Sequence, residues 1–340
     1  VQLKNRIDSL KMIEEYEFIE CKYSKMVSNR IAFIGESLKR NLFALPFLRK
    51  LKGNYDVIYS ISSVLDLILL PWALKSIDEK IKFVAVFDNK VSLEGSGPFL
   101  IRFLAWVFYQ FSLFFLKKAD KIFTVSRELE KYLIAKGFEG GKIEVVGNGL
   151  QVKLITEAQK SDQYNVDALF MGRICSAKGI YDALEVLSIV KKTYPDFQFA
   201  VMGVGDIDEE RRFKKRVKEM NLLNNVRFMG YQMGVEKFTI LKSSKCFWFL
   251  SESESFGQSL LEAVSCGIPA IAYDLRSYGG IYVNDEVFVV KKNDVRAVAK
   301  KVLEIFRDNN FENSAGRLLA EKFSWEKIAR KELQLIMGAG

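Results

Sequence analysis

Residues 246–273 read CFWFLSESESFGQSLLEAVSCGIPAIAY and contain the pattern from which the type of fold can be predicted. An apolar run at 246–250 is followed by a polar loop, by helical spacing over 258–266, and by a second apolar run at 269–273. A strand, a helix and another strand in this order predict one unit of a parallel sheet that is covered on both faces.

The same alternation extends along most of the 340 residues, in two series of apolar runs. We predict the strands of the first series at 16–21, 56–60, 82–87, 121–125 and 143–146. We predict those of the second series at 166–171, 197–203, 226–229, 246–250, 269–273 and 287–290. Helical spacing separates many of them, as over 126–136 and 180–192. The sequence therefore predicts an α/β fold of two doubly wound, Rossmann-like domains with parallel sheets.

A polar stretch at 151–163, where no strong period survives, predicts the linker between the two domains. We place the first domain at 1–155 and the second at 163–320. The remaining residues, 321–340, predict a C-terminal helix that packs back on the first domain.

Composition excludes several classes of site. Histidine is absent, which excludes Ser-His-Asp and Cys-His nucleophiles and every histidine-bearing metal site. The cysteines show no Cys-x-x-Cys spacing, so no zinc site or disulfide framework is predicted and a reducing cytosol is favoured; they are Cys21, Cys175, Cys246 and Cys266. The net charge of +9 favours an anionic partner. The longest apolar run, 99–116, contains Arg102 and Gln110, and we expect a buried helix there rather than a membrane span.

Two cations follow the predicted strand at 166–171. Gly172 permits a tight turn, and Arg173 and Lys178 flank a short loop that opens a helix. A guanidinium fork and a mobile ammonium suit the oxygens of a diphosphate. Two surface cations that merely solvate a loop remain an equal alternative on spacing alone.

Other loops at the carboxyl ends of the strands carry weaker signals. Gly203 and Gly205 mark a turn that is common in parallel sheets. Glu254 precedes the helix that starts near Gly257, and Glu262 lies inside that helix among apolar residues. Such carboxylates can accept two hydrogen bonds from the vicinal hydroxyls of a sugar. The alternative is a helix-start charge and a solvated helical residue.

Taken together and in order, these motifs resemble the retaining glycosyltransferases of family 4 (glycosyl transferases group 1), which have the two-domain GT-B fold. The matches, which span 167–290, are Gly172-Arg173 with Lys178-Gly179, the Gly203 turn, Val226–Gly230, and Glu254 with Glu262 and the Gly267-Ile-Pro269 tail. The first half matches more loosely, through 119–126 and 145–149.

The resemblance implies a role for each matching residue. Arg173 and Lys178 would hold the donor diphosphate, Glu262 the nucleotide ribose, and Glu254 the donor sugar. Donor-binding positions would further include Gly172, Gly203, Gly230, Tyr231, Phe256, Gly257 and Gln258. The family is thought to retain anomeric configuration by same-face attack, with the leaving phosphate taking the acceptor's proton. No protein base, metal or cofactor would then be required.

The sequence departs from the family in two places. Many relatives have a histidine after the strand equivalent to 82–87, where this chain has Asp88 and Asn89, to which we assign an acceptor-side role. Relatives also begin with a strand and a glycine-rich loop, whereas this chain begins directly with the predicted helix at 2–13. We therefore expect the first strand of the first domain to be missing, as in an N-terminally truncated fragment.

The resemblance implies a metal-independent, retaining, hexosyltransferase-type enzyme. It would move sugar from a nucleotide-diphosphate sugar to a glycan or lipid-linked acceptor in bacterial cell-surface polysaccharide or glycolipid synthesis. We expect a cytoplasmic protein whose basic first half docks peripherally on an anionic inner membrane surface. A catalytically silent subunit that binds donor or partner is the alternative. The scattered cations disfavour nucleic acid, and the sequence after Gly203 disfavours a nicotinamide enzyme.

Overall fold

The computed structural model describes residues 30–93, 99–278, 280–282 and 285–338. The strand predicted at 16–21 and the helix predicted at 2–13 lie outside these residues. The chain divides into two compact units, Val1–Ile122 and Phe123–Gly340, and the division falls inside a strand.

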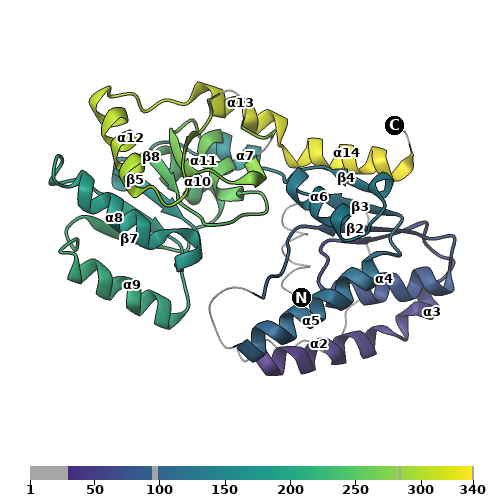
Figure 1. Ribbon diagram of the computed structural model, residues 1–340. Helices are drawn as coiled ribbons and strands as arrows, with labels where there is room; N and C mark the ends of the chain where they lie inside the picture. The colour runs from purple at the N-terminus through teal and green to yellow at the C-terminus, as the bar shows by residue number, and fades with distance from the viewer. Residues whose placement is uncertain (1–29, 94–98, 279, 283–284, 339–340) are drawn as a thin grey trace. The chain divides into compact units, whose positions relative to one another are not determined.

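Four strands form a first sheet in the order β1-β2-β3-β4 (Figure 1). β1 and β2 run parallel, with Val57 opposite Lys82. The strands are β1 Val57–Ser60, β2 Lys82–Phe87, β3 Lys121–Thr124 and β4 Ile143–Val145. The associated helices are α2 Arg30–Ala44, α3 Phe47–Leu51, α4 Leu65–Ile77, α5 Phe99–Leu116 and α6 Arg127–Ala135. The four strands predicted between 56 and 146 are confirmed.

The second sheet has six strands in the order β10-β9-β8-β5-β6-β7, and every neighbouring pair runs parallel. The strands are β5 Val166–Met171, β6 Phe199–Met202, β7 Val226–Gly230, β8 Ser244–Phe249, β9 Ala270–Tyr273 and β10 Phe288–Val290. The helices are α8 Ile180–Val190, α9 Ile207–Glu219, α10 Gly234–Lys242, α11 Gln258–Ser265, α12 Val295–Arg307, α13 Ser314–Lys322 and α14 Trp325–Met337. All six predicted strands are confirmed, and with them the doubly wound α/β fold.

The core of the second sheet explains why its central strands are apolar on both faces. Trp248 is fully buried on β8, and its ring stacks on Phe199 with the centroids 4.8 Å apart. Tyr273 is equally buried and donates a hydrogen bond of 2.6 Å to Asp182 on α8. Apolar burial on this scale is the main stabilising term of such a domain.

The order of the strands locates a binding edge. From β5 the chain builds the sheet outward through β6 and β7, and then returns to build outward through β8, β9 and β10. The direction therefore reverses between β5 and β8. In open α/β sheets, ligands bind beyond the carboxyl ends of the strands at such a reversal.

One local feature was not predicted and one expectation is wrong. The stretch 151–163, which we predict as the linker, contains a short helix, α7 Val152–Glu157, whose six residues are too few to display a period. Helix α5 is not a buried helix, because only 22% of its residues are buried. Exposed rings include Phe99, Phe111 and Phe114. Within the described residues, α5 is the one helix long and apolar enough to cross a membrane by length and composition.

The C-terminal helix lies beside β4 and α6 (Figure 1). Lys331 of α14 donates a hydrogen bond of 2.6 Å to the carbonyl of Val145. At the start of the helix, Trp325 N donates to the carbonyl of Leu150, and Leu150 N donates to the carbonyl of Phe323. Helix α14 therefore packs against the segment 145–150. The predicted domain boundaries stay a prediction.

Candidate functional site

Glycines bring the loops after β5, β6 and β7 into direct contact. Gly172 N donates to the carbonyl of Met202 at 3.0 Å, and Gly203 N donates to the carbonyl of Gly230 at 2.7 Å. Gly203 has a φ of 149°, and a Cβ there would overlap the carbonyl oxygen of Gly172. Only glycine therefore allows this spacing, and the backbone of three predicted donor loops forms one continuous edge.

A second close approach joins the loop after β5 to the loop after β8. Gly179 has a left-handed φ of 69°, and a Cβ there would overlap the carbonyl oxygen of Leu250. Glu252 N donates a hydrogen bond of 3.0 Å to the carbonyl of Ala177. The two loops flank the reversal of strand order, so the contact places the residues of both loops at the predicted binding edge.

Lys178 and Glu254 meet across this contact. Lys178 Nζ lies 2.5 Å from Glu254 Oε1, and the two side chains are 28% and 14% exposed. The sequence predicted both residues for one site, and the structure brings them together from positions 76 residues apart. The predicted Arg173 lies at the start of the same loop with an exposed side chain. Within the described part of the chain, its guanidinium makes no hydrogen bond or ion pair.

The loop after β8 turns into α11 at Gly257, which adopts a left-handed φ of 85°. Phe256 is buried, and its ring meets that of Phe323 edge-on with the centroids 6.0 Å apart. Gln258, the first residue of α11, donates hydrogen bonds to the carbonyl of Gly149 at 3.0 Å and to Glu262 Oε1 at 3.4 Å. Residues 256–258, which lead into α11, are thus held by the ring of Phe323 and by the carbonyl of Gly149.

Glu262 is only 9% exposed, which rules out the solvated alternative. Its Oε1 accepts a hydrogen bond from Lys237 Nζ at 2.8 Å. Lys237 belongs to α10 and was not predicted, because nothing in the sequence around it differs from an ordinary surface lysine. Its partner lies 25 positions away. Only the packing of α10 near α11 reveals the pair.

Two tyrosines whose hydroxyls are buried were also missed. Within the described residues, the hydroxyls of Tyr278 and Tyr282 are buried without a hydrogen-bond partner, and their rings lie 5.6 Å apart. Burial is the main cause that raises the pKa of both hydroxyls, and the charge of Glu254 raises it further. Both phenols are therefore neutral donors in the electrostatic range of the Lys178–Glu254 pair.

The remaining predicted residues are Tyr231 in the second unit and Asp88 and Asn89 in the first. Tyr231 is 69% exposed after β7, and Gln232 donates to the carbonyl of Met229. Asp88 and Asn89 belong to the other unit, at the carboxyl end of β2. Asp88 accepts a hydrogen bond of 3.2 Å from the hydroxyl of Ser62.

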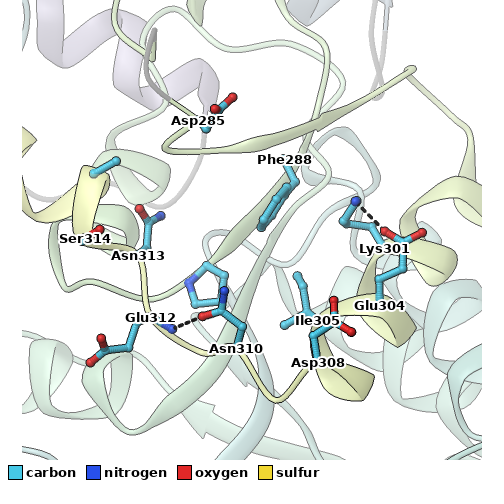
Figure 2. Close-up of a pocket in the computed structure, with 12 residues that line it drawn as sticks. Asp285, Phe288, Lys301, Glu304, Ile305, Asp308, Asn310, Glu312, Asn313 and Ser314 are labelled. Atoms are coloured by element: carbon cyan, nitrogen blue, oxygen red, sulfur yellow. Dashed lines mark hydrogen bonds and ion pairs between the residues drawn. The ribbon is translucent and has the colours of Figure 1, made fainter.

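A separate hollow of about 330 Å³ lies beside the amino ends of β9 and β10, opposite the binding edge (Figure 2). It is lined by Pro269, which directly precedes β9, and by Phe288, the first residue of β10. Lys301 and Glu304 of α12 form a 2.5 Å ion pair on its wall. None of the residues predicted to bind donor or acceptor lines the hollow, and its ion pair offers a chemically matched control for the pair at the binding edge.

The fold and this edge define a class, the GT-B glycosyltransferases. Residues 153–321 match the family model Glycosyl transferases group 1, and residues 16–154 match the model Glycosyltransferase Family 4. The chain belongs to this glycosyltransferase family.

Several curated proteins are similar in sequence to this chain. The chain is 25% identical over 81% of its length to an uncharacterized glycosyltransferase of Methanocaldococcus jannaschii, and covers 67% of that protein. It is 24% identical over 91% of its length to a phosphatidyl-myo-inositol mannosyltransferase of Propionibacterium freudenreichii, and covers 78% of that protein. The chain spans about half, 55%, of the length of a matching glycogen synthase of Mycobacterium tuberculosis.

Solved structures confirm the fold. A sucrose-phosphate synthase from Thermosynechococcus elongatus superposes with a TM-score of 0.76 at 20% identity, over 94% of this chain and 82% of that one. Anabaena HepE in complex with UDP-glucose superposes with a TM-score of 0.70 at 15% identity, over 89% of this chain and 82% of that one.

Proposed function

We propose that this protein is a retaining, metal-independent, hexosyltransferase-type enzyme that moves a sugar from a nucleotide-sugar donor to a glycan or lipid-linked acceptor. The process it would serve is bacterial cell-surface polysaccharide or glycolipid synthesis. One observation carries the proposal. The ammonium of Lys178 and the carboxylate of Glu254 lie together at the reversal of the sheet, on loops that glycines lock against each other.

The pair suggests how the site balances its own charges. Lys178 is neutralised by Glu254, so neither partly buried charge is left alone. In the proposed complex, Lys178 joins Arg173 on the diphosphate, and Glu254 exchanges its cation for hydroxyls of the donor sugar. Both groups would then stabilise charge where it develops as the glycosyl–phosphate bond breaks.

The proposed reaction uses no protein base. The acceptor hydroxyl attacks from the face that the diphosphate leaves, and its proton passes to the departing phosphate oxygen. The bond from the anomeric carbon to the phosphate oxygen breaks, and the bond to the acceptor oxygen forms on the same face. Glu262, fixed by Lys237, would hold the ribose, and main chain at Gly203, Gly230 and 256–258 would contact base, sugar and phosphate.

The proposal is tested with the full chain and a panel of UDP-, GDP- and ADP-sugars. We expect one donor to raise the melting temperature and to be slowly hydrolysed in the absence of acceptor. NMR of the first-formed sugar product should show the anomeric configuration of the donor, and chelation by EDTA should leave the rate unchanged. An inverted product, or loss of activity with EDTA, would contradict the retaining or the metal-independent part.

The second candidate, a catalytically silent subunit, would bind a donor without releasing sugar. The joint presence of Arg173, Lys178, Glu254 and Glu262 opposes this candidate, because a site that does no chemistry has no physical need for all four. Tight nucleotide binding with no hydrolysis of any donor, and no transfer to lipid or glycan extracts, would favour the silent subunit.

We propose in addition that the protein is cytoplasmic and docks on an anionic membrane surface. Helix α5 exposes Phe99, Phe103 and Phe114, and basic residues in the first unit include Arg49, Lys50 and Lys52. Aromatic and basic residues favour an anionic interface. Flotation with vesicles that contain phosphatidylglycerol should carry the protein upward at low salt. Recovery only in the bottom fraction would end this part of the proposal.

A further inference from the structure

A cavity of about 380 Å³ lies within the second unit, where α6 begins. Its wall is formed by the starts of α6 and α14, by residues 145–147, and by Phe256 of the loop after β8. Phe256 immediately precedes Gly257, at which α11 starts. The cavity therefore adjoins the proposed donor loop without containing Arg173, Lys178 or Glu262.

The charges around this cavity are all positive. Four cationic side chains line it and no carboxylate does; the four are Arg127, Lys322, Lys327 and Lys331. Lys331 is anchored on the carbonyl of Val145, and Lys322 lies over the ring of Phe323 at 5.5 Å. In the described part of the chain, the exposed side chains of Arg127 and Lys327 make no hydrogen bond or ion pair. Two cations are therefore available to a ligand.

The cavity also contains a buried hydroxyl with no partner. Ser126 is 3% exposed, and its Oγ makes no hydrogen bond within the described residues. Ser126 is the N-cap residue of α6, but its side chain does not cap the helix. Buried hydroxyls nearly always find a partner. Because Ser126 lines the cavity, a hydrogen-bond acceptor bound there would supply the missing partner.

The start of α6 supplies further donors. The helix has nine residues, and the first amide groups of a helix have no partner within it. Such amides and the positive end of the helix dipole favour an anion. The acidic residues of this turn, Glu128 and Glu130, do not line the cavity.

We propose that this cavity binds a phosphate group of the acceptor substrate. Ser126 Oγ and the first amides of α6 would donate to its oxygens, and Arg127 and Lys327 would neutralise its charge. The assignment to the acceptor rests on the proposed function, in which the donor diphosphate already has Arg173 and Lys178. The acceptor class would then be phosphorylated sugars, polyols or lipids rather than neutral glycans.

The test measures binding of inorganic phosphate to the full chain by calorimetry at low salt. We compare wild type with Arg127→Gln, Lys327→Gln and Ser126→Ala. Arg330→Gln is the control, because Arg330 is an exposed cation of α14 that does not line the cavity. We expect each charge variant to weaken binding about tenfold, as for loss of one charged hydrogen bond, and the control to change it less than twofold. Equal binding by wild type and both charge variants would overturn the proposal.

A second arm separates the acceptor from the donor. The titration is repeated with whichever of UDP, GDP or ADP binds the protein at saturation. We expect phosphate to bind unchanged beside the nucleotide, and the variants to retain wild-type affinity for the nucleotide. Displacement of phosphate by the nucleotide would assign the cavity to the donor and overturn the proposal. Failure of all three nucleotides to bind would instead count against the proposed function, while the first arm still decides the cavity.

Discussion

Lys237 Nζ lies 2.8 Å from Glu262 Oε1, and the two side chains are 17% and 12% exposed. The pair joins α10 to α11. Removing one partner of a buried ion pair is strongly destabilising, because the other charge is left buried without compensation. The lysine therefore fixes the direction of the one carboxylate that we assign to the ribose.

We predict that Lys237→Met weakens nucleotide binding about tenfold, because Glu262 loses its orientation and charge partner. Glu262→Ala should weaken it at least as much. The double variant should be no weaker than Glu262→Ala alone, as expected for coupled residues. Calorimetry with the best-binding nucleoside diphosphate measures all three. Lys301→Met removes the matched pair at the opposite edge and should leave the affinity unchanged. Additive losses would show that the two residues act separately.

Lys178→Ala should mainly lower the rate of donor turnover. Loss of one group that stabilises the departing diphosphate costs about 3–4 kcal/mol of activation free energy, or a hundredfold or more in kcat. Nucleotide affinity should change much less, because Arg173 and the main chain remain. Initial rates at saturating donor measure the effect, with Lys301→Ala as the control. Turnover at the wild-type rate would remove Lys178 from the proposed mechanism.

Gly179→Ala should destabilise the second unit and abolish donor binding. The new Cβ would overlap the carbonyl of Leu250, and the left-handed φ of 69° adds strain. Gly53→Ala is the matched control, since Gly53 has a φ of 74° but no atom within 4 Å of a Cβ. Backbone strain alone should cost about 1–2 kcal/mol at Gly53, and the overlap should cost several more at Gly179. Equal melting temperatures for the two variants would contradict the close contact.

The buried thiols should be inert in the folded protein. Burial raises the pKa of Cys246 and of Cys266 to about 12, so roughly a thousandth of each is thiolate at pH 9. Iodoacetamide followed by mass spectrometry should label both residues only after denaturation, whereas the partly exposed Cys175 should react in the folded state. Rapid native labelling of Cys246 would indicate that the core of the second sheet opens.

The same thiols predict the direction of an alkaline effect. Their pKa is raised on folding, so above about pH 9 the unfolded state loses these protons while the folded state keeps them. The contribution of the neutral thiols to the free energy of unfolding is fully present below about pH 9 and declines as the pH rises toward 12. Melting temperatures measured from pH 8 to 10.5 should fall, and a rise over that range would contradict the assignment.

The sequence predicted the parts of the fold that depend on local pattern. Strands such as β5 and β8 are apolar on both faces, so their positions could be read directly. Helix α7 was missed because six residues complete fewer than two turns. Helix α5 was predicted to be buried because its composition is that of a core helix, but composition does not state how much of a helix its neighbours cover.

The candidate site shows the same division. Lys178, Glu254 and Glu262 occupy motif positions, and their grouping followed from the rule that strand ends share an edge. The resemblance to the family did not point to Lys237, Tyr278 or Tyr282. The proposed roles of these residues depend on their contacts with other side chains, which the sequence does not show. The cations around Ser126 come from segments about 200 residues apart and form no motif at all.

Gly149 stands between two helices that are remote in sequence. A Cβ on it would overlap the indole of Trp325, and its carbonyl accepts the hydrogen bond from Gln258 at the head of α11. Truncation of the chain before Trp325 would therefore affect residues outside the deleted helix α14. It would expose Gly149 on the side that Trp325 covers and weaken the hydrogen bond from Gln258 to the Gly149 carbonyl. We therefore expect donor binding to weaken as well. Helix α14 thus helps to hold the first residue of α11, which we assign to the proposed donor site.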